Sequence, residues 1–120
     1  MKLHLKKCVP CEGGITPLPL REARKMLEIL PAGWKIAENG AGIPQLRKTF
    51  VFKNFAKAIA FVNRIAAIAE SQGHHPDIVV FGWNKVRIEL YTHAIRGLHE
   101  NDFVMAARID HVYTVKNKGF

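Results

Sequence analysis

Residues 55–72 constrain the fold of this 120-residue chain more than any other segment, because they carry two apolar stripes at helical spacing. The stripes consist of Phe55, Ile59, Val62 and Ala66, and of Ala58, Phe61, Ile65 and Ile68. An ordinary surface helix has one such stripe, which faces the core of its own domain. We therefore expect one stripe to pack on the chain's own sheet and the other on a second subunit. The alternative is a helix that its own chain covers on both sides, for which so short a chain offers little material.

Helical periodicity also predicts helices over residues 20–30 and 99–113. Pro31 ends the first of them, and Asn54 is a suitable N-cap for the central helix. The inward face of the last helix is predicted to comprise Met105, Ala106, Ile109, Val112 and Tyr113. Asp102 lies one turn upstream on the same stripe, which would turn a carboxylate toward the core.

Apolar and polar residues alternate, or apolar residues run together, in four segments that we interpret as strands. One strand opens at Trp34, and the others cover residues 45–53, 77–83 and 85–93. Gly82 and Asn84 suit a tight turn between the last two. The resulting order, αββαββα, predicts an α+β protein with an antiparallel sheet that helices cover on one face. We expect one domain over residues 1–120, with an irregular lead-in at 1–18.

The chain is basic, with a formal net charge of +8 and a pI near 9.8. Its Lys and Arg residues are scattered, and the densest groups lie at the two termini, so nucleic acid is not the expected partner. The opening residues lack the apolar core of a secretory signal, and no apolar run is long enough to span a bilayer. We therefore expect a cytoplasmic protein with no membrane partner.

Cys8 and Cys11 form a C-x-x-C pair near the N-terminus. Two cysteines do not suggest a disulfide framework in a reducing compartment. Three interpretations remain for the two thiols. They bind no metal, they form half of a zinc site that His4 or another subunit completes, or they form a redox pair. Because no strand precedes the motif, a thioredoxin-like redox site is the weakest of these readings.

Three histidines are placed to converge. His74 and His75 are adjacent and precede Pro76, where the backbone must leave helical geometry, and His93 ends the next predicted hairpin. An antiparallel hairpin brings that end back beside His75. Zinc, acid–base chemistry and a structural role all remain open. Adjacent histidines are a poor pair of zinc ligands, whereas imidazole gives and takes protons near neutral pH, so acid–base chemistry fits better.

The spacing of these residues resembles that of the pterin-4a-carbinolamine dehydratase family (4a-hydroxytetrahydrobiopterin dehydratases), bacterial members included. Glu70 is followed after fixed intervals by His74-His75-Pro76, Trp83, His93 and Asp102. The stretches GHHPDI, WNKVRIEL, THAIRGL and ENDFVMAARID carry the resemblance, as do Gly33-Trp34 and FAKAIAFVNRIA upstream. It covers about residues 18–113. One departure is His99, where the family more often has a Ser or Thr that would cap the last helix.

The resemblance implies a four-stranded antiparallel sheet with three helices on one side, assembled into homodimers or homotetramers. It implies loss of water from a 4a-hydroxytetrahydropterin, which recycles the cofactor of aromatic amino acid hydroxylases such as phenylalanine hydroxylase, with no redox cofactor or metal. His74 and His93 would be the acid–base pair, and His75 would orient the pterin. Glu70 and Asp102 would fix imidazole tautomers or bind the pterin's amide edge. Thr92 and Trp34 would line the pocket, with a core position as the alternative for Trp34.

A different reading is a non-catalytic dimerisation or assembly cofactor built on the same fold. Such a role uses the helical surface and tolerates loss of the catalytic residues. All three histidines are intact in this chain, which favours the enzyme.

Overall fold

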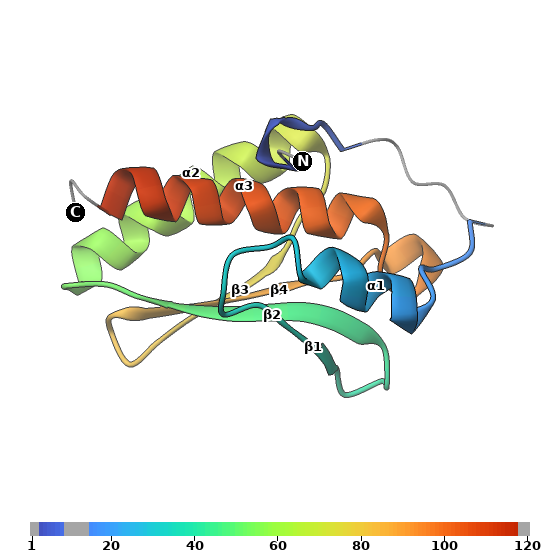
Figure 1. Cartoon of the computed structure of the whole chain (residues 1–120). Helices are drawn as coiled ribbons and strands as arrows, with labels where there is room; N and C mark the ends of the chain where they lie inside the picture. The colour runs from blue at the N-terminus through green and yellow to red at the C-terminus, as the bar shows by residue number, and fades with distance from the viewer. Residues whose placement is uncertain (1–2, 9–14, 118–120) are drawn as a thin grey trace.

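The computed structural model describes residues 3–8 and 15–117, with side chains described as far as Val115. Three helices lie on one face of a four-stranded antiparallel sheet (Figure 1). The helices are α1 (Leu20–Leu27), α2 (Phe55–Gln72) and α3 (Glu100–Asn117), and the strands are β1 (Lys35–Glu38), β2 (Pro44–Val51), β3 (Asp77–Phe81) and β4 (Lys85–Leu90). The predicted α+β class, the αββαββα order and the one-sided helical layer are confirmed.

The central helix, α2, has the bounds that the sequence predicted. The side chain of Asn54 accepts a hydrogen bond from the backbone N–H of Lys57, as an N-cap does, and Gly73 ends the helix in a left-handed conformation (φ 64°). Ala58, Phe61 and Ile65 of the second predicted stripe are fully buried. The first stripe is more open, and the Phe55 side chain that begins it is 54% exposed.

The sheet has the strand order β1-β2-β4-β3, and its register builds the floor of the core. Leu46 and Phe50 of β2 lie opposite Leu90 and Val86 of β4, and all four are essentially inaccessible to solvent beneath the helices. Burying side chains of this size contributes about 1.5–3 kcal/mol each. This apolar layer packs the sheet against the helices and so fixes where the ends of β3 and β4 lie relative to α2 and α3.

Several element boundaries in the N-terminal half differ from the prediction, including those of β2, which covers Pro44–Val51 and not residues 45–53. Helix α1 ends at Leu27 rather than at residue 30, and Leu30 donates its N–H to Leu27 in a tighter turn. The reason is Pro31, which disfavours helical geometry in the residue before it. Trp34 precedes β1 instead of opening it, because the backbone at Gly33 is left-handed (φ 105°) and the ladder starts only at Lys35.

The β3–β4 hairpin is also shorter than predicted, since β3 ends at Phe81 and β4 at Leu90 rather than at residues 83 and 93. Gly82 and Trp83 both take positive φ (56° and 58°), which turns the chain out of the ladder. At the other end, Thr92 donates its N–H to the Gly97 carbonyl (2.8 Å) and closes a small loop. His93 therefore begins a short 3₁₀ turn, η2 (His93–Ile95), and does not lie at the end of a strand.

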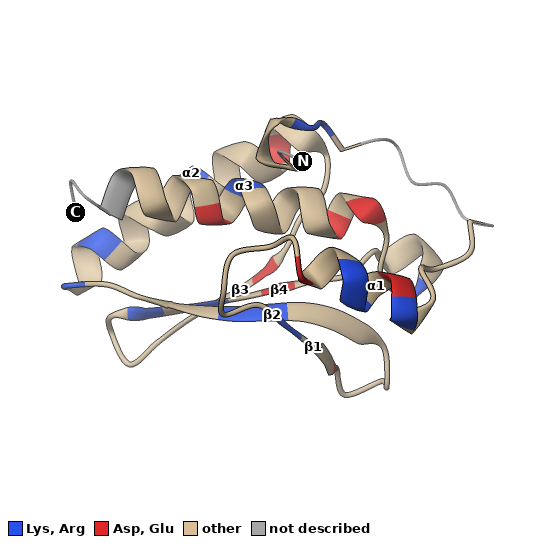
Figure 2. Ribbon diagram, in the orientation of Figure 1, with Lys and Arg blue, Asp and Glu red and all other residues tan. Residues whose placement is uncertain are grey.

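Part of the lead-in that we predicted to be irregular is a second 3₁₀ turn, η1 (Leu3–Leu5), whose Leu3 side chain is buried in the core. Cys11 lies outside the described residues. The cations are spread over helices and strands, as the sequence indicated (Figure 2). Within the described parts of the chain, no helix is both long and apolar enough to cross a membrane.

Candidate active site

His74 is hydrogen-bonded to a buried carboxylate. It follows Gly73, which ends α2, whereas Asp102 lies in the first turn of α3. The Nε2 atom of His74 is 2.7 Å from Oδ1 of Asp102. The Asp102 side chain is fully buried, and the His74 side chain is 11% exposed. The imidazole is therefore fixed to a carboxylate inside the protein and keeps only a small exposed surface.

Asp102 has two further donors. The hydroxyl of Thr92 and the backbone N–H of His99 both donate to Oδ2 of Asp102, each at 2.9 Å. An ionised carboxylate only accepts hydrogen bonds, so in the tautomer that matches this contact a neutral His74 carries its proton on Nε2 and has a lone pair on Nδ1. Thr92 is itself buried and supports Asp102, and its predicted place in the pocket lining stays a prediction.

The start of α3 is capped by His99. Its Nδ1 atom accepts the backbone N–H of Asn101 (3.0 Å), while its own N–H donates to Asp102. This pattern resembles a capping box, with histidine in the place of Ser or Thr, except that the ring accepts from the second helical residue and not from the third. The departure noted at this position therefore keeps the cap. The spacing of His99 and Asp102, three residues apart at the start of a helix, is the sequence feature that could have predicted this cap.

His75 comes two residues before β3, and His93 comes three residues after β4. The register pairs Asp77 of β3 with Glu89 of β4, so residues just before β3 lie beside residues just after β4. The Nε2 atom of His75 is 2.5 Å from Oε2 of Glu70, and both side chains are largely exposed.

His93 is exposed, and its ring stacks on that of Tyr91, with centroids 4.2 Å apart. Tyr91 was not among the predicted site residues. It became visible only in three dimensions, because the stacking follows from the turn η2 and not from any motif. The stacked tyrosine limits the orientations that the His93 ring can take.

Trp34 lies apart from this cluster. It is buried, its indole N–H donates to the carboxylate of Asp110, and Lys48 holds the same carboxylate at 2.7 Å. Asp110 lies eight residues beyond Asp102 on α3, about 12 Å along the helix. The structure thus places Trp34 in the core, which was the alternative reading of this residue.

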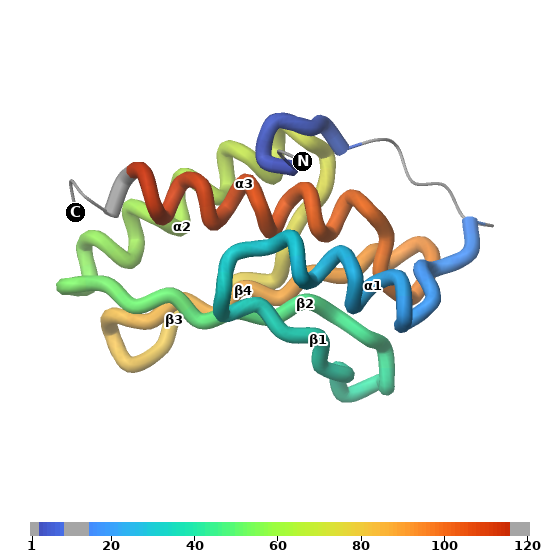
Figure 3. Tube along the Cα trace, viewed as in Figure 1, coloured from blue at the N-terminus to red at the C-terminus, as the bar shows by residue number. Residues whose placement is uncertain are grey.

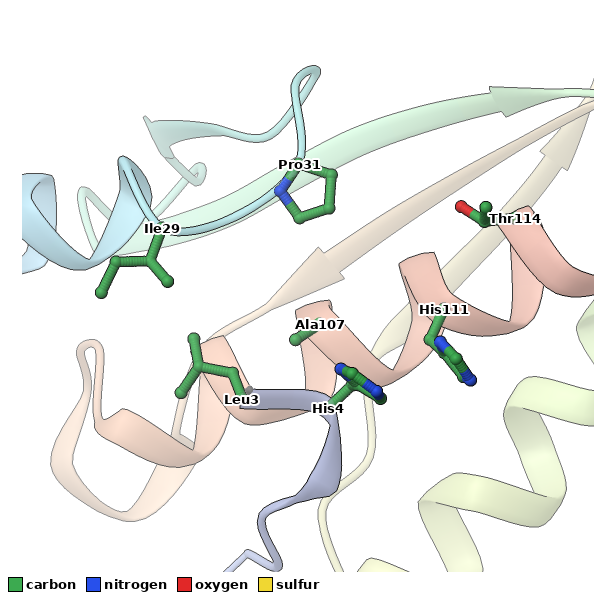
Figure 4. Close-up of a pocket in the computed structure, with 7 residues that line it drawn as sticks. All are labelled: Leu3, His4, Ile29, Pro31, Ala107, His111 and Thr114. Atoms are coloured by element: carbon green, nitrogen blue, oxygen red, sulfur yellow. The ribbon is translucent and has the colours of Figure 1, made fainter. Parts of the chain in front are cut away.

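A separate pocket of about 320 Å³ lies between η1, α3 and the segment after α1 (Figure 4). It contains the rings of His4 and His111, stacked with centroids 4.3 Å apart. His4, a candidate partner of the cysteine pair, therefore stacks on another histidine. Among the described residues, no group of three or more His, Cys, Asp or Glu side chains is placed to hold a metal ion. The zinc reading of the cysteine pair stays untested, because Cys11 is not among these residues.

The structure is that of an α+β protein with a helical layer on a four-stranded antiparallel sheet, in which a buried carboxylate holds an imidazole. The sequence profile of the family described as pterin 4 alpha carbinolamine dehydratase matches residues 16–112. The chain belongs to this family. A relative in Nitrosomonas europaea, provisionally named a pterin-4-alpha-carbinolamine dehydratase, is 46% identical over 108 residues, which is 90% of each chain.

Two solved structures are similar. A transcriptional coactivator/pterin dehydratase from Brucella melitensis is 30% identical, with a TM-score of 0.71 over 81% of this chain and 98% of that one. A pterin dehydratase-like protein, described as a RuBisCO assembly factor in the alpha-carboxysome, is 32% identical, with a TM-score of 0.55 over 67% and 88%. The fold of this family thus accompanies more than one activity.

Proposed function

We propose that the protein dehydrates a 4a-hydroxytetrahydropterin to the quinonoid dihydropterin, as a hydro-lyase that recycles tetrahydrobiopterin. The observation that carries the proposal is the bond between His74 and the buried Asp102. It would leave Nδ1 of His74 as the proton acceptor, near the end of the β3–β4 hairpin that His75 precedes and His93 follows. Membership of the family supplies the substrate class.

The reaction is an elimination in which an acid protonates the 4a-hydroxyl group, the C–O bond breaks and water leaves. A base takes a proton from the adjacent ring nitrogen, whose electrons form the C=N bond. Protons balance and no electrons are exchanged with a cofactor. We assign the base to Nδ1 of His74, since its other nitrogen is held by Asp102. We assign the acid to His93, because its ring is exposed to solvent and stacks on Tyr91.

His75 is assigned to binding. Its Nε2 atom is held by Glu70, and both side chains are open to solvent, so together they present a polar edge to the pterin. Asp102 has all its described bonds inside the protein, so we assign it to fixing the tautomer of His74 rather than to the pterin amide. Trp34 has no role in this assignment.

The test is the dehydration rate with chemically generated 4a-hydroxypterin, after the uncatalysed rate has been subtracted. His74→Ala and His93→Ala should each lower kcat by about 10²–10⁴-fold. The double variant should lose less than the product of the single losses, since acid and base act in one step. His75→Ala should raise KM more than it lowers kcat. Near-normal turnover of His74→Ala or His93→Ala, with an unchanged circular dichroism spectrum, would reject the acid–base assignment.

A second candidate is a non-catalytic role in dimerisation or in the assembly of another enzyme. It is favoured by the exposed Phe55 at the start of the open stripe of α2, and by the similarity to a RuBisCO assembly factor. The histidine variants distinguish the two roles. An assembly cofactor would form the same complexes without His74 and His93, and the wild-type protein would not accelerate dehydration.

We propose the remaining partners on the same basis. The substrate is a pterin and the protein forms a homodimer or homotetramer. A reductase returns the product to tetrahydropterin, which then serves a hydroxylase such as phenylalanine hydroxylase. A cytoplasmic location, with no membrane partner and no nucleic acid partner, stays a prediction from the sequence. Sedimentation of the purified protein and its co-purification with a hydroxylase test the two partner proposals.

A further inference from the structure

The N-terminal segment Leu3–Cys8 lies outside the region that the family profile matches, yet it packs on two helices of the fold. Figure 3 shows it beside α3 and the last turn of α2. Its middle is fixed to α3, because Arg108 donates from Nε to the Lys6 carbonyl (2.9 Å) and Lys6 pairs with Glu100 (2.6 Å).

The end of this segment reaches the polypeptide on both sides of the His74–Asp102 bond. The backbone N–H of Cys8 donates to Oε1 of Gln72 at 2.9 Å, and the Cys8 thiol lies 3.7 Å from the carbonyl oxygen of Asn101. Gln72 is the last residue of α2, two residues before His74, and Asn101 directly precedes Asp102. One short segment therefore contacts the neighbours of both partners.

The end of α2 is held by its C-cap. Gly73 is left-handed and its N–H donates to the Ala69 carbonyl, to which the N–H of His74 also donates at 3.3 Å. His74 is then followed by a residue that precedes proline and has left helical geometry. The position of the His74 ring thus depends on how firmly the end of α2 is held. A misplacement of about 1 Å can cost about 10²-fold in rate.

We propose that Gln72 is a positioning residue and that the segment Leu3–Cys8 braces the His74–Asp102 pair through it. An effect of this segment on catalysis rests on the proposed dehydratase function. Its effect on the geometry of the His74–Asp102 pair is independent of that function, because it follows from the contacts of Cys8 with Gln72 and Asn101.

The chemistry of Cys8 agrees with a brace. Burial raises the pKa of its thiol to about 11, an effect that Arg108 opposes and Asp102 reinforces. The thiol stays protonated at neutral pH and acts as a donor toward Asn101. Because the thiolate is the reactive and metal-binding form, Cys8 in this position is a poor nucleophile and a poor ligand. Its backbone N–H, which any residue except proline supplies, is the group that binds Gln72.

Two matched pairs of variants test the proposal in the full-length protein. Gln72→Met removes the acceptor at similar size, whereas Gln72→Glu keeps an acceptor oxygen. Cys8→Pro removes the N–H donor, whereas Cys8→Ser keeps it. Ser71→Ala, a change at the neighbouring exposed residue, is the control for the helix end. The readouts are the NMR signal of the His74 ring proton bonded to Asp102, the hydrogen exchange of the His74 amide, and kcat and KM separately.

Gln72→Met and Cys8→Pro should each weaken the ring-proton signal, speed His74 amide exchange and lower kcat about tenfold. Combining them should add little, because both remove the same bond. Gln72→Glu, Cys8→Ser and Ser71→Ala should resemble the wild type. Unchanged ring-proton signal and amide exchange in both Gln72→Met and Cys8→Pro would overturn the brace. If the wild type lacks dehydratase activity, the NMR readouts still decide the question, so the two failures are distinguishable.

Discussion

Asp102 holds His74 with one carboxylate oxygen and caps the N-terminus of α3 through His99 with the other. A single buried side chain thus fixes a helix start and an imidazole tautomer. Because Thr92 donates to the same oxygen as His99, the loop that leads to His93 is tied to this carboxylate as well.

Replacing Asp102 by Asn should lower kcat by about 10²–10⁴-fold, because an amide can donate to His74 and favour the wrong tautomer. Asp110→Asn is the matched control. Asp110 is also buried on α3, but it binds Trp34 and Lys48. The control should lower the urea midpoint of unfolding and leave kcat unchanged. Equal losses of kcat in the two variants would mean that Asp102 acts only through stability.

The cap of α3 gives a prediction about stability. His99→Ala should lower the free energy of unfolding by about 1 kcal/mol, since the N–H of Asn101 loses its acceptor. His99→Ser should retain most of that free energy, because a hydroxyl caps the same position. Urea denaturation of the three proteins measures both changes. A Ser variant that is as unstable as the Ala variant would show that the ring contributes through packing instead.

The open stripe of α2 predicts self-association. Phe55→Asp should shift the wild-type oligomer toward a 13.5 kDa monomer in sedimentation at micromolar concentration. Burying a phenylalanine side chain is worth about 1.5–3 kcal/mol, which a charge at the interface would remove. Leu20→Asp, at an exposed apolar position on α1, is the control and should not change the mass. A wild-type protein that sediments cleanly as a monomer contradicts the prediction.

The buried thiol of Cys8 predicts a loss of stability at alkaline pH. Its pKa is raised from 9.0 to about 11 in the folded protein, so the unfolded chain ionises first as pH rises. The stability contribution is fully present below about pH 9 and is lost between about pH 9 and pH 11. The difference in unfolding free energy between wild type and Cys8→Ser isolates this effect from other titrating groups. A difference that stays constant over this range would contradict it.

The cysteine pair should be dispensable for catalysis. Replacing Cys8 and Cys11 by Ser keeps the backbone N–H that binds Gln72, so kcat should remain near that of the wild type. Turnover and metal content should be measured together. Loss of activity that tracks the loss of stoichiometric zinc would restore the zinc reading of this motif.

Local periodicity was enough to predict the fold class and the bounds of α2, whereas the convergence of the three histidines stays a prediction. These features depend on the alternation of apolar residues and on the geometry of an antiparallel hairpin, which short stretches of sequence specify. The family resemblance added Glu70, Thr92, Trp34 and Asp102 as site candidates. It did not show which of these side chains are buried or which polar partners they bind.

Those positions depend on contacts between residues far apart in the chain. Only the tertiary structure showed that Thr92 serves Asp102, that Trp34 belongs to the core with Asp110, and that Cys8 reaches Gln72. The ends of β3 and β4 were likewise decided by left-handed backbone at the hairpin and by the Thr92–Gly97 closure. Sequence patterns fix which face of an element is apolar. Which polar partner a side chain finds depends on how the helices are placed over the sheet.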